Sequence, residues 1–89
     1  MKVENMTSST GNKIANQMII TDNGFESFQS YETIIARKDN INHIVQLDKE
    51  KWDYSKTTSK YRNQFLHETK KETQAKIDSG EYQLVDLNE

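Results

Sequence analysis

The chain has 89 residues, of which 33% are hydrophobic and 29% are charged, with a formal net charge of -2 and no cysteine. A chain of this length forms one domain with a thin core, because small domains bury a smaller share of their surface than large ones do, and a homodimer would bury more of it. The missing cysteine excludes disulfides, thiolate metal sites and thiol nucleophiles, and it is compatible with a reducing compartment.

The first twelve residues are polar and rich in Ser, Thr and Asn. Their apolar surface is too small to offset the entropy lost on ordering, so we expect residues 1–12 to be a flexible amino-terminal arm. Residues 13–89 would then form a single small α+β domain. Its first strand is predicted at residues 15–21, which end in β-branched side chains. Asn23-Gly24 follows and predicts a type I′ hairpin turn, because both residues tolerate positive φ.

The return strand is predicted from residue 25 to about residue 38. Phe25 and Phe28 have an odd spacing and cannot share one face of a regular strand, so we expect a bulge near Gln29-Ser30. A turn at residues 39–42 and a third strand at residues 43–48 would complete an antiparallel meander.

Helical periodicity begins after the only Trp. Ser55 and Thr57 are alternative N-caps, since either hydroxyl can accept an unpaired N–H of the first turn. Tyr61 and Phe65 are spaced i, i+4, and Leu66 widens the same apolar face. We expect this face to cover the sheet.

A second helix is predicted to begin at Thr69, because Thr69 and Glu72 have the T-x-x-E pattern of a capping box. Gly80 would end it in the left-handed conformation. Residues 82–87 alternate as a last strand. The expected fold is therefore α+β: a three-stranded antiparallel β-meander, then two short helices packed on the sheet and a final short β-strand.

No enzyme motif is present, and we predict no catalytic, cofactor-binding or metal-ligating residue. His43 and His67 lack the spacing of metal ligands. The closest acidic cluster is Asp48, Glu50 and Asp53, which is interleaved with lysines and is expected to be a set of solvated loop charges. The protein is therefore not expected to be an enzyme.

The charge distribution marks one segment. Residues 49–76 carry eight Lys and Arg against four acids, a net +4, between acidic flanks. Lys and Arg beside hydroxyls at a helix N-terminus suit anion binding, and interleaved aromatics can stack on bases or fill a protein pocket. The predicted partner-binding residues are Trp52, Tyr54, Lys56, Lys60, Arg62, Asn63, Lys70 and Lys71.

The same residues also have ordinary structural explanations. Trp52 can fill the core, the lysines can form an ordinary solvated helix face, and Arg62 can pair with Asp53. The apolar runs are far shorter than the ~20 residues of a membrane span, and the first ten residues lack the apolar region of a signal peptide. We expect a protein of the cytoplasm, with no membrane partner.

The strings FQSYETIIA, VQLD, WDYSKTTSKYRNQFLHETKKET and SGEYQLVDLN cover much of the chain. They resemble a family of small uncharacterised proteins carried by bacteriophages and mobile elements of low-GC Gram-positive bacteria. Relatives have Gly at the end of the first helix, where this chain has His67. The resemblance implies a phage accessory protein that acts in the host cytoplasm, without catalytic residues or cofactor.

Two functions follow as expectations. In the first, the protein binds a host protein and acts as an inhibitor of a host defence nuclease or complex. In the alternative, it is a small nucleic-acid-binding protein that uses the basic 49–76 segment, and its affinity would then fall steeply with salt. The overall charge of -2 favours the first.

Overall fold

The sheet begins with the expected Asn23-Gly24 turn. In the computed structural model, which describes residues 1–88, Asn23 and Gly24 have φ values of 48° and 88°. They join strands β2 (Lys13–Asp22) and β3 (Phe25–Ser30), which pair antiparallel. The hairpin is therefore confirmed.

The predicted single strand over residues 25–38 is two strands. β3 is followed by β4 (Thr33–Asp39), and the turn between them contains Tyr31 in the left-handed region at φ 56°. The backbone N–H of Tyr31 donates to the carbonyl of Asn16 at 2.7 Å, which holds the turn against β2. The expected irregularity is present, as a register shift between Phe28 and Gln29 in the β3–β4 pairing.

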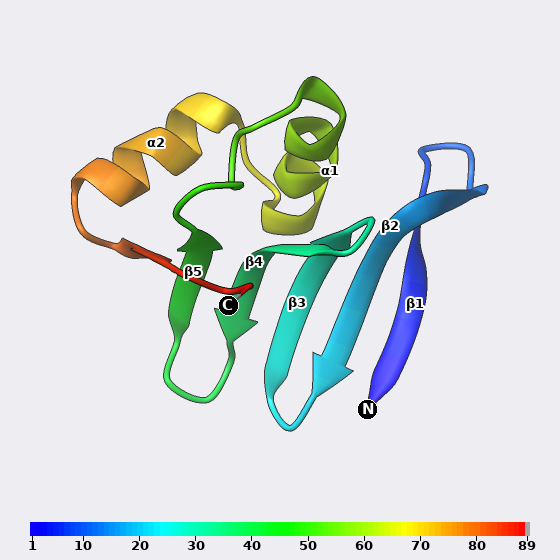
Figure 1. Ribbon diagram of the computed structural model, residues 1–89, viewed down its shortest axis with the longest axis horizontal. Coiled ribbons are helices and arrows are strands. Elements are labelled where there is room, and N and C mark those ends of the chain that lie inside the picture. The colour runs from blue at the N-terminus through cyan, green and yellow to red at the C-terminus, as the bar shows by residue number, and fades with distance from the viewer. Residues whose placement is uncertain (89) are drawn as a thin grey trace.

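The sheet is also larger than expected. β1 (Lys2–Thr7) lies inside the expected amino-terminal arm and pairs antiparallel with β2, and Met6 is 3% exposed. β5 (Ile44–Asp48) continues the meander beside β4. The expected final strand, β6 (Tyr82–Val85), pairs parallel with β5. The strand order is β1-β2-β3-β4-β5-β6, so the meander has five strands instead of three (Figure 1).

Helix α1 (Lys56–Leu66) has Ser55 as its N-cap, whose Oγ accepts from the N–H of Thr58 at 3.1 Å. It ends at His67, which takes the left-handed conformation at φ 56°. In this chain His67 therefore takes the left-handed position that glycine occupies at many helix ends.

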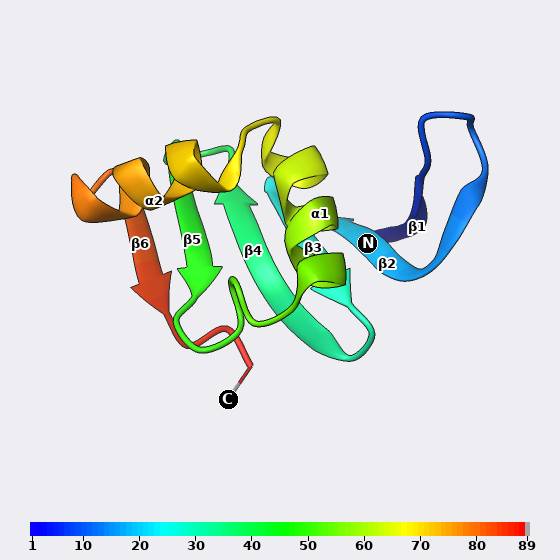
Figure 2. The ribbon, with the colours of Figure 1, turned by 90° about the horizontal axis from the view of Figure 1, so that it is seen from above.

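Helix α2 (Lys70–Asp78) begins with the predicted capping box. The Thr69 side chain accepts from the N–H of Glu72, and the Glu72 carboxylate accepts from the N–H of Thr69. Gly80 follows the helix at φ 83°, as expected. Both helices lie on one face of the sheet (Figure 2), and no helix within residues 1–88 covers the other face.

The core lies between the helices and the sheet. Phe65 of α1 is 4% exposed, and its ring centroid lies 5.9 Å from that of Phe28 in β3. Tyr61 packs half-buried against the same cluster, and Ile35 and Leu47 are fully buried. The predicted aromatic face of α1 is confirmed.

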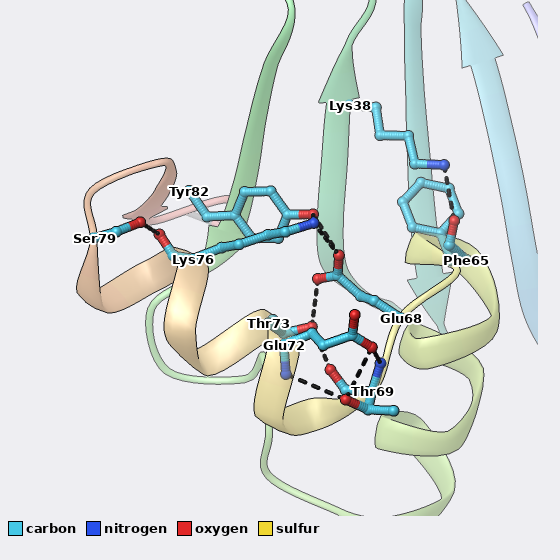
Figure 3. A network of polar contacts seen from close by, with 9 residues as sticks. All are labelled: Lys38, Phe65, Glu68, Thr69, Glu72, Thr73, Lys76, Ser79 and Tyr82. Carbon is cyan, nitrogen blue, oxygen red and sulfur yellow. Dashed lines mark hydrogen bonds and ion pairs between the residues drawn. The ribbon is translucent and has the colours of Figure 1, made fainter.

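A buried carboxylate ties α2 to the sheet (Figure 3). Glu68 accepts hydrogen bonds from Thr73 Oγ1 at 2.6 Å, Lys76 Nζ at 2.7 Å and Tyr82 Oη at 2.9 Å. Burial alone would raise the pKa of Glu68, but these hydrogen bonds outweigh it and lower the pKa. Because the network joins α2 to β6, it fixes the position of α2 on the sheet and with it the position of Lys70, the first residue of the helix.

Candidate functional site

An open hollow of about 360 Å³ lies where the amino-terminal ends of α1 and α2 meet the loop before α1. We call it the helix-layer hollow. Of the predicted partner-binding residues, the structure brings Tyr54, Lys56 and Lys70 together around it. The residues that line it are Asp53, Tyr54, Ser55, Lys56, Ser59 and Lys70.

Arg62 lies beneath this surface. Its side chain is fully buried, and its Nη1 donates to the carbonyl of Trp52 at 2.6 Å and to Asp53 Oδ1 at 3.0 Å. The guanidinium carbon is 5.0 Å from the centroid of the Trp52 ring. The pairing with Asp53 that we left open is thus the one observed. Because a buried guanidinium cannot reach a partner, we withdraw Arg62 from the partner-binding set.

Two further predicted residues surround Arg62 instead of the hollow. Trp52 is half-buried and packs against the core, and Asn63 is half-buried with its Oδ1 accepting from Arg62 Nη2 at 2.9 Å. Their contacts support the buried arginine, so neither is placed as a principal contact of the hollow.

The carboxylate of Asp53 is hydrogen-bonded to three side chains at the hollow. Partial burial on its own would raise its pKa, but hydrogen bonds from Lys70, Ser59 and Arg62 outweigh it and lower the pKa from 3.8 to about 2. Lys70 Nζ lies 2.7 Å from Oδ2, and Ser59 Oγ donates to Oδ1 at 2.8 Å. The carboxylate is ionised and fully engaged at neutral pH, so it is not a free general base.

The expectation that Asp48, Glu50 and Asp53 are solvated loop charges is therefore wrong for two of the three. Asp48 is 3% exposed and accepts backbone N–H groups from Glu50, Lys51 and Leu87. Only Glu50 is exposed, as expected for a solvated loop charge. An Asp whose side chain accepts N–H groups two and three residues later is typical of a turn, and that spacing could have identified the role of Asp48.

The remaining charge around the hollow is positive. Lys56, Lys60 and Lys71 are exposed, and within residues 1–88 none of them forms an ion pair. No acidic residue lies in the first turn of α1, and the carboxylate at this end of the helix, that of Asp53, is already paired with Arg62 and Lys70. Lys60 of α1 and Lys71 of α2 are not among the residues that line the hollow.

One aromatic ring is presented beside these cations. Tyr54 is 48% exposed, and Lys51 Nζ lies 5.1 Å from its ring centroid. An exposed tyrosine held beside a lysine offers both apolar area and a hydroxyl to a partner.

Among residues 1–88, no group of three or more His, Cys, Asp or Glu side chains is placed to hold a metal ion. Neither of the helices that the structure describes is long and apolar enough to cross a membrane.

A second hollow, of about 270 Å³, lies on the uncovered face of the sheet. The sequence interpretation missed it, because its residues come from three strands and form no motif. The alternate positions of β2 and β3, which place Ile20 and Phe25 on the same face, are the pattern that could have indicated it.

Comparison with known proteins gives one match. The model of a family of unknown function, DUF8033, matches residues 1–81. None of the curated proteins and none of the solved structures matches the chain.

Proposed function

The chain belongs to the DUF8033 family, and from its structure we propose that it is a non-enzymatic binding protein that docks an acidic surface of a partner protein. The docking surface is the helix-layer hollow with the lysines of α1 and α2 around it. The observation that carries the proposal is the exposed Tyr54 at the hollow together with Lys56, which forms no ion pair within residues 1–88.

The chemistry of this surface suits carboxylates on a folded partner. Lys56 stands at the start of α1, where free backbone N–H groups and the helix dipole also favour negative charge. Rim lysines increase the rate of encounter with an acidic surface, while Tyr54 can supply the buried anchor at its centre.

Nucleic-acid binding is the weaker candidate. Three of the eight basic residues in the 49–76 segment, namely Arg62, Lys70 and Lys76, are engaged in internal ion pairs. Arg62 is also out of reach of solvent. Fewer cations are therefore free for phosphates than the charge count of the segment implies.

The partner to test first is a host protein. The resemblance to phage-carried proteins motivates this choice, and it extends the proposal to an inhibitor of a host defence nuclease or complex in the host cytoplasm. The binding surface does not depend on that extension.

Capture from the lysate of a Gram-positive host tests the proposal. The tagged native chain should enrich a protein that the variant Lys56→Glu/Lys60→Glu does not enrich. Lys2→Glu/Lys13→Glu is the matched control, since it makes the same change of charge at exposed lysines of β1 and β2. Arg62 is left intact because a charge reversal at that buried position would unfold the protein.

Two outcomes would contradict the proposal. Equal enrichment by the native chain and by Lys56→Glu/Lys60→Glu would show that the lysines do not form the docking surface. A mobility shift of DNA or RNA that weakens steeply with salt, without any protein enriched, would support the nucleic-acid alternative instead.

A further inference from the structure

The face of the sheet that the helices leave uncovered carries a mixed row of side chains. The strand registers align Val3, Ile20, Ser27 and Arg37 across β1 to β4. Side chains at directly paired positions point to the same face of a sheet. Since Phe28, the partner of Ile19, packs against Phe65 of α1, the row with Ile20 lies on the opposite face.

This face also carries four apolar side chains from neighbouring strands. Val3 is 51% exposed and Phe25 36% exposed, and Ile20 and Ile34 line the 270 Å³ hollow between the strands. We call this the sheet-face hollow. Its six lining residues are Ile20, Asp22, Phe25, Ser27, Ile34 and Arg37.

Two contacts within the hollow orient Arg37. Its guanidinium carbon lies 5.9 Å from the centroid of the Phe25 ring, and its Nε donates to Ser27 Oγ at 3.4 Å. No carboxylate within residues 1–88 lies at ion-pair distance from it. The Nη groups are therefore free to form a two-pronged contact with a carboxylate from outside the chain.

Asp22 supplies the complementary group on the same face. Asp22 of β2 pairs with Phe25 of β3. Arg37 lies two strands away, in β4, on the row that passes through Ile20, so it is offset from Asp22 by two residues along the strand direction. With strands about 4.8 Å apart and about 3.3 Å per residue, the two Cα atoms are separated by roughly 12 Å. One cation and one anion thus flank an apolar centre, without an ion pair between them in this chain.

We propose that the sheet-face hollow is the interface of a homodimer, in which Arg37 of each copy pairs with Asp22 of the other. When two sheets stack about a two-fold axis that lies between them, each contact from one residue of the first copy to another residue of the second is repeated in the reverse direction. An axis that crosses the hollow between Arg37 and Asp22 forms both ion pairs at once and brings the Phe25 rings of the two copies to the centre. The self-complementary charges are what select a second copy over another partner.

The size of the face is sufficient for this dimer. The protein exposes 5743 Å² and has extents of 35 × 29 × 23 Å. The sides of a block of that shape carry between about an eighth and a fifth of the surface, roughly 770–1,170 Å², a range that includes the ~800 Å² per partner of a standard interface. Two sheets stacked about 10 Å apart would also add a second apolar layer to a domain whose single core holds eight buried apolar residues.

Sedimentation equilibrium of the full chain over a dilution series tests the proposal. The native protein should show a monomer–dimer equilibrium. Arg37→Asp and Asp22→Arg each place like charges opposite one another, and each should raise the dissociation constant at least about tenfold. The double exchange Arg37→Asp/Asp22→Arg should restore the dimer, because it rebuilds both ion pairs with reversed polarity.

Lys56→Glu serves as the matched control for Arg37→Asp, because it makes the same change of charge on the helix layer and should leave dimerisation unchanged. Melting curves of all variants identify any that do not fold, and the double exchange then decides the question independently. A native chain that is monomeric at every concentration overturns the proposal. So does a dimer that neither single variant weakens, or one that the double exchange does not restore.

Discussion

Replacing Asp53 by Asn should destabilise this protein severely, although Asp53 lies at the surface. The substitution removes the carboxylate that faces the fully buried Arg62 and keeps the shape of the side chain. Breaking a buried ion pair on one side costs about 3–5 kcal/mol, because the remaining charge is left uncompensated. Asp53 is 24% exposed, and Arg62 keeps the carbonyl of Trp52, so we expect a loss of about 3 kcal/mol, at the lower end of that range.

That loss is large relative to the whole. A domain of 89 residues has a free energy of unfolding of about 4–13 kcal/mol at the usual stability per residue. Urea unfolding followed by the fluorescence of the only tryptophan, Trp52, measures it directly, since Arg62 stacks on that ring. The m-value should stay unchanged, because the substitution does not alter the surface exposed on unfolding.

Two further variants isolate the cause. Lys70→Ala removes the other partner of Asp53, but Lys70 is 59% exposed, so its loss should cost less than about 1 kcal/mol. Arg62→Met added to Asp53→Asn should restore stability, because the unpaired charge is then gone. A cost of Asp53→Asn below about 1 kcal/mol, or no recovery with Arg62→Met, would refute the reasoning.

The same ion pair sets a dependence on pH. The pKa of Asp53 is lowered from 3.8 to about 2 in the folded protein, so the unfolded chain takes up the proton first as the pH falls. The stabilisation is complete above about pH 4 and is lost as the pH falls through 2. Stability of Asp53→Asn should accordingly fall less between these pH values than stability of the native protein.

Two other substitutions test backbone conformation. His67→Gly should raise the free energy of unfolding by about 1 kcal/mol in urea titrations, because His67 ends α1 at φ 56° and glycine has no side-chain penalty there. Lower stability of this variant would contradict that. Gly24→Ala should cost about 1–2 kcal/mol in the same assay, since Gly24 has φ 88°. The added Cβ would also meet Ile41 Cδ1 at 2.6 Å, but Ile41 is 66% exposed and can move, so adding Ile41→Ala should not rescue it.

The elements that the sequence predicted are those determined by local contacts. Ser55, the Thr69–Glu72 capping box, Gly80 and the Asn23-Gly24 turn each act within three or four residues, and all are found where expected. The i, i+4 face of α1 was predicted for the same reason. Local hydrogen bonds and backbone preferences are written in adjacent residues, so no tertiary information is needed.

The elements that were missed depend on distant partners. β1 has one buried apolar residue, Met6, and is held by pairing with β2, which no periodicity in KVENMT indicates. The β3–β4 turn places Tyr31 at positive φ, where the expected residues are Gly, Asn or Asp. Its amide is held by Asn16, fifteen residues earlier.

The same distinction divides the predicted site. The lysines and Tyr54 were identified from the composition of their segment. Such a side chain is exposed wherever nothing covers it, so no particular tertiary contact had to be predicted. The position of Arg62 depends on the path of the loop that carries Asp53 and Trp52, so the sequence could name the Arg62–Asp53 pair as an alternative but could not choose it.

The two proposed surfaces lie on opposite faces of one thin domain, and this arrangement gives them a joint consequence. A dimer formed through the uncovered sheet faces leaves both helix layers outside, each with its own Tyr54 and Lys56. Such a dimer is bivalent. A partner that carries two copies of its acidic surface would be held far more tightly by the dimer than by one domain, because the second contact forms within the same complex. A small domain with a modest binding surface would then gain affinity through assembly, without further contacts on the helix layer.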